Sequence, residues 1–258
     1  MHEDTFATYI LISLAALAAG AINAMAGGGT LLTFPALLAI LNPVAANATS
    51  TFALFPGSLA SIWGYRKEVA ASRRWLSFLL WPSLIGGAIG SLAVTRFPDK
   101  VFENLVPWLL ITASTLFVVQ RPIAKWIGAH PHDEPHGRTV AVIIFFQFLV
   151  GIYGGYFGAG IGILMLSSLA FMGIGDIHKM NALKSILASA MNGVTVLIFM
   201  IEGRIVWKYA FAMALAAIAG GYLGARLARR LPAAYVRTIV IVVGFGVAGY
   251  SFYKRFAS

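Results

Sequence analysis

Two glycine-rich breaks interrupt apolar stretches of the sequence, and polar side chains flank the first of them. The glycines of the two breaks are Gly27, Gly28, Gly29, Gly158 and Gly160. The amide of Asn23 precedes the first break, and the hydroxyl of Thr30 follows it. A helix that begins after such a break directs its unpaired N–H groups and the positive end of its dipole at the break. We therefore expect these residues to bind a small anion.

A second set of polar residues opens the next apolar stretch of each half of the chain. Its members are Asn47, Thr49 and Ser50 in the first half and Asn181, Lys184, Ser185 and Asn192 in the second. Residues three or four apart share a helix face, so Asn181 can line up with Lys184 and Ser185. A cation at the centre of a bilayer costs ~2.5–3.5 kcal/mol, and a bound anion would offset much of that. We therefore expect this set to complete the substrate site.

Each candidate has a plainer structural interpretation, which the sequence leaves open. Glycines permit close packing of membrane helices, and hydroxyls cap helices or bond between them. We assign packing to Gly86, Gly90, Gly220 and Gly224 but binding to the two breaks, because an apolar segment too short to span a bilayer follows each break. The alternative for Lys184 is that its long side chain snorkels to the membrane interface.

The composition predicts the elements that position these residues, namely membrane-spanning helices. The chain has 258 residues, of which 59% are hydrophobic and only 11% charged, whereas soluble domains carry roughly 25% charged residues. A span needs ~20 apolar residues, which leaves room for about eight to ten spans. The apolar segments are 6–25, 30–41, 44–64, 75–95, 101–120, 139–157, 161–173, 181–201, 207–225 and 235–252. We expect an all-α polytopic membrane protein.

The charge and the missing cysteines exclude several other classes. The net charge of +10 comes from basic residues in short loops, which indicates membrane orientation rather than a nucleic-acid partner. The absence of cysteine excludes disulfides and thiol catalysis. The acidic start of the chain argues against a cleaved signal peptide. No span carries a nucleophile with a base or a carboxylate pair, so we expect neither an enzyme nor a cofactor.

The second half of the sequence repeats the first. Three glycines, Gly20, Gly27 and Gly29, recur 131 residues later, and Asn47, Glu68 and Pro98 recur 134 residues later. This predicts a first repeat over 1–120, a cytoplasmic linker over 121–138 and a second repeat over 139–258. The linker holds three histidines, but it lacks the spacing of a defined metal site. We interpret it as a solvated loop and expect no metal.

Each repeat has five segments, an odd number, so the second copy should be inverted in the membrane relative to the first. If the N-terminus is outside, the inside loops carry twelve basic residues and the outside segments six. Basic residues favour the cytoplasmic side, so this bias predicts that both termini are outside. Each repeat should then contribute a broken hairpin and three spanning helices.

The repeated motifs resemble those of the sulfite exporter TauE/SafE family of bacterial membrane permeases. The resemblance lies in GAINAMAGGGTLLTFP at 20–35, ANATST at 46–51, GIYGGYFGAG at 151–160 and MNALKS at 180–185. The second copy lacks a match to Pro35, which predicts a less sharp second break. The resemblance implies a multi-pass transporter of the bacterial inner membrane that moves sulfite, sulfonates or related small anions.

Three function classes stay open at this point. The first is a carrier or facilitator of small sulfur-containing anions, the second a permease for another small anion or metabolite, and the third a non-transporting membrane scaffold. An inside-negative membrane drives anions outward by roughly 2.3 kcal/mol per charge per 100 mV, which favours export. The expected partners are a small anion and the lipid bilayer. The oligomeric state stays open, with a homodimer as one candidate.

Overall fold

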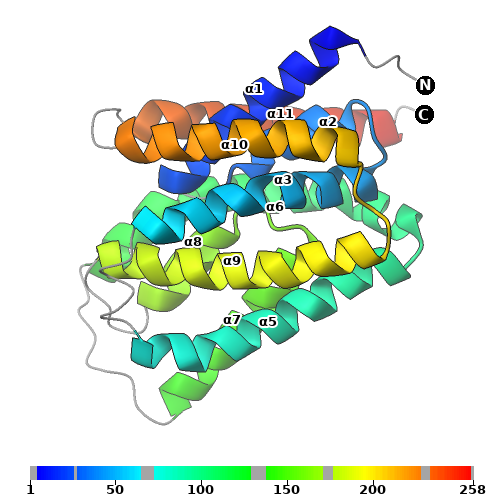
Figure 1. The fold of residues 1–258 in the computed structure, drawn as a ribbon. Helices are drawn as coiled ribbons and strands as arrows, with labels where there is room; N and C mark the ends of the chain where they lie inside the picture. Colours follow the sequence, from blue (N-terminus) through cyan, green and yellow to red (C-terminus); the bar gives the residue numbers. More distant parts are fainter. Residues whose placement is uncertain are drawn as a thin grey trace.

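The computed structural model describes residues 5–25, 28–64, 73–128, 138–170, 177–227 and 233–256, and within these ranges the chain is helical and has no strand. The helices are α1 (Phe6–Met25), α2 (Thr30–Leu38), α3 (Pro43–Gly64), α5 (Arg73–Arg96), α6 (Asp99–Gly128), α7 (Arg138–Tyr156), α8 (Ile161–Ala170), α9 (Ile177–Ile201), α10 (Trp207–Leu227) and α11 (Ala233–Phe256) (Figure 1). The predicted all-α class is confirmed.

Several of these helices are suited to a lipid environment. Within the described residues, three stretches are long and apolar enough to cross a bilayer, namely Phe6–Asn23, Trp75–Arg96 and Ala182–Ile201. Two shorter apolar stretches lie at Val140–Tyr156 and Ile241–Tyr253. Large apolar side chains are exposed on the outer surface of the helices, as a lipid-facing surface requires. The chain is thus a polytopic membrane protein, while the total of eight to ten spans stays a prediction.

Two short helices follow the two glycine breaks. Helix α2 has nine residues and α8 has ten, so each is about 15 Å long, half the thickness of a bilayer core. The backbone is left-handed at Gly28 (φ 98°) in the first break, and at Gly158 (φ 77°) and Gly160 (φ 78°) in the second. The second break therefore has two left-handed glycines, whereas the described part of the first break has one. Pro35 lies inside α2 rather than at the break. The relative sharpness of the two breaks stays a prediction, because residues 26 and 27 lie outside the described part of the chain.

A side chain six residues upstream fastens each break. The Gly29 N–H donates to Asn23 Oδ1 at 2.8 Å, and the Tyr153 hydroxyl donates to the carbonyl oxygen of Ala159 at 2.8 Å. Such partners replace the helical hydrogen bonds that a break removes, which is what lets a broken helix persist in an apolar surrounding. A specific hydrogen bond therefore stabilises each break.

Packing between the helices follows the same pattern in both halves. Helix α1 packs on α10 as α7 packs on α5, and α3 packs on α10 as α9 packs on α5. The backbone of Gly220 approaches that of Leu17, and the backbone of Gly86 approaches that of Phe148 in the same way. Close packing at Gly86, Gly90 and Gly220 is confirmed, whereas the surroundings of Gly224 lie outside the described residues. The inverted orientation of the two copies in the membrane stays a prediction.

Ion pairs join two connections that are far apart in sequence. Arg96 pairs with Glu202 at 2.9 Å, and Arg204 pairs with Asp99 at 3.3 Å. Arg204 also donates to the carbonyl oxygen of Thr95 at the end of α5. The α5–α6 and α9–α10 connections therefore lie at one end of the helix bundle, where α1 begins and α11 ends (Figure 1). The distribution of basic residues in the sequence predicts that these two connections and both termini lie on the same, outer side of the membrane.

The predicted linker is helical at its start. Helix α6 continues to Gly128, and α7 begins at Arg138. Residues 121–128, which the sequence predicts to be part of the loop, therefore belong to α6. The histidine-rich part, at 129–137, lies outside the described residues. The division of the chain into two repeats and a linker stays a prediction.

Candidate functional site

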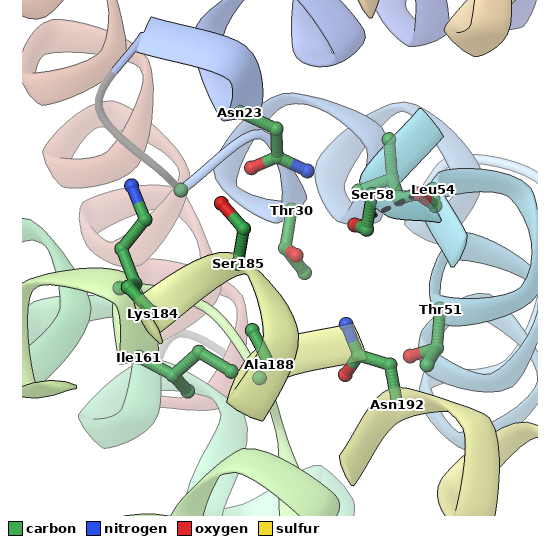
Figure 2. A pocket seen from close by; sticks show the side chains of 13 residues that line it. Asn23, Thr30, Thr51, Leu54, Ser58, Ile161, Lys184, Ser185, Ala188 and Asn192 are labelled. Carbon is green, nitrogen blue, oxygen red and sulfur yellow. Dashed lines mark hydrogen bonds between the residues drawn. The ribbon is translucent and has the colours of Figure 1, made fainter. Parts of the chain in front are cut away.

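Both breaks open onto one cavity of about 60 Å³. Its walls come from the ends of both broken helices and from α3 and α9, which follow the two short helices (Figure 2). The lining residues are Asn23, Gly28, Thr30, Thr51, Leu54, Ser58, Gly158, Ile161, Gly162, Lys184, Ser185, Ala188 and Asn192. Corresponding elements of the two halves thus meet at a single site.

The first wall is the start of α2. Gly28 adopts the left-handed backbone that turns the chain, and its carbonyl oxygen accepts the N–H of Leu31 at 3.0 Å in the first turn of the helix. Thr30 is the first residue of α2, and Asn23 faces it from the last turns of α1 (Figure 2). This wall therefore offers an amide and a hydroxyl beside the positive end of a helix dipole.

The second wall carries the charge. Lys184 lies in the second turn of α9 and is only 5% exposed. Among the residues that the structure describes, it is the one buried side chain with a formal charge. Its side chain extends toward the point where α1 ends and α2 begins, and Ser185 lies beside it (Figure 2). The lysine thus brings a positive charge to the α2 break from the other half of the chain.

The third wall is formed by α3 and by the middle of α9. Thr51 and Ser58 lie two turns apart on α3, and Asn192 lies two turns beyond Lys184 on α9. None of the described lining residues is acidic. The cavity therefore combines one cation with neutral amides and hydroxyls, and this chemistry suits an anion far better than a cation.

The predicted site residues divide into two groups. The structure brings Asn23, Gly28, Thr30, Gly158, Lys184, Ser185 and Asn192 together around the cavity. Gly27 and the side chain of Asn181 lie outside the described residues. The other five predicted residues are described, but they lie outside the cavity lining.

Three of those five connect α3 to its neighbours. Asn47 donates from Nδ2 to the carbonyl oxygen of Tyr156 at 3.0 Å, and the N–H of Val206 donates to Thr49 Oγ1 at 3.0 Å. Ser50 Oγ and Thr33 Oγ1 share a hydrogen bond of 2.6 Å. These contacts match the alternative that the sequence left open, hydrogen bonding between helices.

Packing accounts for the positions of the remaining two. A Cβ at Gly29 would collide with the backbone of Ala19, so this glycine lets the break fold back against α1. Gly160 faces the backbone of Ala113 on α6. Neither glycine therefore lines the cavity, although both shape the breaks that do.

The lining also includes six residues that are not among the candidates given above, namely Thr51, Leu54, Ser58, Ile161, Gly162 and Ala188. The repeat offered a signal for one of them, because Ser58 occupies the position that matches Asn192 in the second copy. Thr51 follows Asn47 by one helical turn, which gave a weaker signal. Leu54, Ile161 and Ala188 are ordinary apolar residues in apolar helices, so nothing in their type distinguishes them from core residues.

Comparison with known proteins identifies the family of the chain. The family model described as Sulfite exporter TauE/SafE matches residues 12–251, nearly the whole chain. The chain belongs to this family. No solved structure matches it.

Relatives in the family are named as membrane transporters. A probable membrane transporter protein of Haemophilus influenzae is 26% identical over 229 residues, which cover 87% of this chain and 86% of the relative. One from Sinorhizobium sp is 27% identical over 250 residues, covering 96% and 94%. The probable membrane transporter protein YfcA of Escherichia coli is 28% identical over 233 residues, covering 88% and 83%. The chain is accordingly a bacterial multi-pass membrane transporter and not an enzyme.

Proposed function

We propose that this transporter moves small sulfur-containing anions, such as sulfite or organosulfonates, across the cytoplasmic membrane and out of the cell. The observation that carries the proposal is the buried Lys184 at a cavity that both broken helices open onto. A positive charge held among apolar helices is stabilised by an anion of opposite charge. The family description names sulfite export, which supports sulfur oxyanions as the first substrates to test.

The size of the cavity supports a small substrate. A buried water needs roughly 10–15 Å³, so about 60 Å³ has room for roughly four to six groups of that size. Sulfite, sulfate and the shortest sulfonates are of this size. The polar lining, with no carboxylate among its described residues, supports an anionic substrate over a cationic one.

The membrane potential supports the outward direction. Moving one negative charge out of an inside-negative cell releases roughly 2.3 kcal/mol per 100 mV. An exporter of anions can therefore run without a coupled proton. Both termini are proposed to lie in the periplasm, following the distribution of basic residues along the sequence.

A second candidate is a permease for another small anion. The lining groups are an ammonium, amides, hydroxyls and backbone, and none of them has a chemical preference for sulfur over carbon or phosphorus. Carboxylates or other oxyanions of similar size would meet the same groups. A screen of anions separates the two candidates.

The test is anion flux through the purified full-length protein in liposomes with an imposed potential. We expect flux of sulfite or a small sulfonate that follows the potential, and little flux of neutral solutes of the same size. Lys184→Gln should lower the flux about ten- to a hundredfold, because a hydrogen bond to a charged group contributes about 1.5–3 kcal/mol. Lys100→Gln, on the exposed first turn of α6, is the control and should transport normally. Equal flux through the Lys184 and Lys100 variants would overturn the proposal.

A further inference from the structure

The two sides of the cavity differ in the hydrogen bonds that they can offer. On one side, Asn23 Oδ1 already accepts the N–H of Gly29, so the remaining NH₂ group makes Asn23 a donor. Lys184 has donors and no acceptor. The side built from α1, α2 and the start of α9 is therefore rich in donors, which suits the oxygen atoms of an anion.

The hydroxyls of α3 have the opposite character. Thr51 Oγ1 donates its proton to the carbonyl oxygen of Asn47 at 2.8 Å, and Ser58 Oγ donates to that of Leu54 at 3.2 Å. A hydroxyl has one proton and two lone pairs, so each of these oxygens has only acceptor capacity left for the cavity. Lys184 lies at one side of the cavity, and Thr51 and Ser58 lie at the other (Figure 2).

We infer that the cavity selects an anion that also carries an N–H or O–H donor, and that Thr51 and Ser58 determine this specificity. The inference rests on the proposed function, since it concerns the same cavity. The negatively charged oxygens of the substrate contact Lys184 and Asn23, and its N–H or O–H group donates to the hydroxyl oxygens of α3. Suitable substrates are protonated oxyanions and compact amino- or hydroxy-substituted sulfonates.

An anion without a donor meets these two oxygens less favourably. It presents either lone pairs or an apolar group to these half-buried oxygens, and an acceptor that loses water without gaining another donor is less favourable. The hydroxyls could turn to donate to such an anion only by giving up their bonds to the carbonyl oxygens of Asn47 and Leu54. The site therefore distinguishes ligands of equal charge and size by their donors.

Sulfamate and methanesulfonate form a matched pair for the test. Both carry one negative charge at neutral pH and have nearly the same shape, but sulfamate has an NH₂ group where methanesulfonate has a methyl group. Binding to the full-length protein in nanodiscs is measured by calorimetry. We expect sulfamate to bind about tenfold more tightly, the effect of about one buried hydrogen bond.

Variants of α3 assign the preference to its hydroxyls. Thr51→Val and Ser58→Ala each remove one acceptor, and either single variant should lower the preference for sulfamate about threefold or more. The double variant should bind the two anions with nearly equal affinity. Ser91→Ala is the control, because Ser91 is a buried serine that donates to the carbonyl oxygen of Gly87 on α5 and does not line the cavity. It should leave the preference unchanged.

The outcomes separate this inference from the proposed function. If the wild type binds both anions equally and Lys184→Gln weakens both, the donor requirement is wrong and the anion site stands. If the double variant keeps the wild-type preference, the assignment to Thr51 and Ser58 is wrong. If sulfamate, methanesulfonate and sulfite all fail to bind, the proposed function and this inference both fail.

Discussion

Asn23 has two roles, because its two amide atoms face different partners. Its oxygen accepts the Gly29 N–H and fastens the first break, while its nitrogen remains for the cavity. An aspartate at this position would keep the first role and lose the second. A carboxylate can still accept from Gly29, but it would place a negative charge where the substrate's charge belongs.

We therefore predict that Asn23→Asp folds but binds anions more weakly. Affinity for sulfite or sulfamate should fall at least about tenfold, because one favourable donor is replaced by a repulsive charge. The readout is calorimetric binding, together with the elution profile and thermal midpoint of the purified variant. Asn42→Asp is the control, since Asn42 Oδ1 accepts the N–H of Ala45 at an exposed position at the start of α3. Anion binding by Asn23→Asp at wild-type strength would contradict the role given to this side chain.

The type of a polar residue in an apolar helix can be read from the sequence, but the direction in which its side chain faces cannot. Lys184 is a candidate from the sequence because a cation within an apolar run is energetically costly, and the structure places it at the cavity. Asn47, Thr49 and Ser50 are equally polar, yet their hydrogen bonds go to Tyr156, Val206 and Thr33. All of them lie within one helical turn, and the sequence does not show which faces of α3 meet other helices and which face meets a cavity.

At the scale of elements, the glycine breaks fix where the short helices begin. The predicted segments start at 30 and 161, and α2 and α8 begin at those residues. Helix α2 ends at Leu38, three residues before the end of its predicted apolar run, whereas the residues after Ala170 lie outside the described part of the chain. A helix start is marked by a local backbone requirement, whereas an apolar residue that follows the last turn looks the same as one within it.

The second break gives a stability prediction. Gly158 has a φ of 77°, a conformation that costs other residues about 1–2 kcal/mol, and a Cβ there would lie 3.2 Å from the carbonyl oxygen of Gly154. Gly158→Ala should therefore lower the free energy of unfolding by about 1–2 kcal/mol. Gly246→Ala is the matched control, because a Cβ at that position in α11 would meet nothing within 4 Å.

Thermal unfolding of both variants in detergent measures this difference. The control should unfold at the wild-type temperature or slightly above it, since alanine favours a helix more than glycine does. If Gly158→Ala is as stable as Gly246→Ala, the left-handed turn is not required at the second break.

At the scale of the whole molecule, both halves surround one site with matching elements. The neighbours of α1, α3 and α10 correspond to those of α7, α9 and α5, so each half completes the packing of the other. The sequence repeat predicted two similar units. It did not predict that α1 would pack on α10 and α5 on α7, because periodicity within one segment carries no information about its distant partner.

The membrane orientation can be measured directly, because the natural chain has no cysteine to give background labelling. We predict that single cysteines introduced at Thr5 and Ser258 react with a membrane-impermeant maleimide in intact spheroplasts. A cysteine introduced at His132, in the linker between the halves, should react only after permeabilisation. Labelling of His132→Cys in intact spheroplasts, with none at the termini, would reverse the proposed orientation.

The ion pairs between the α5–α6 and α9–α10 connections have a consequence for turnover. They join the first half of the chain to the second, so any motion that parts the halves at this end must break them. Arg96 is 72% exposed in its pair with Glu202, and such a pair contributes only about 0–1 kcal/mol. Salt screens such exposed pairs and weakens them further, so we expect the rate of transport to rise with ionic strength.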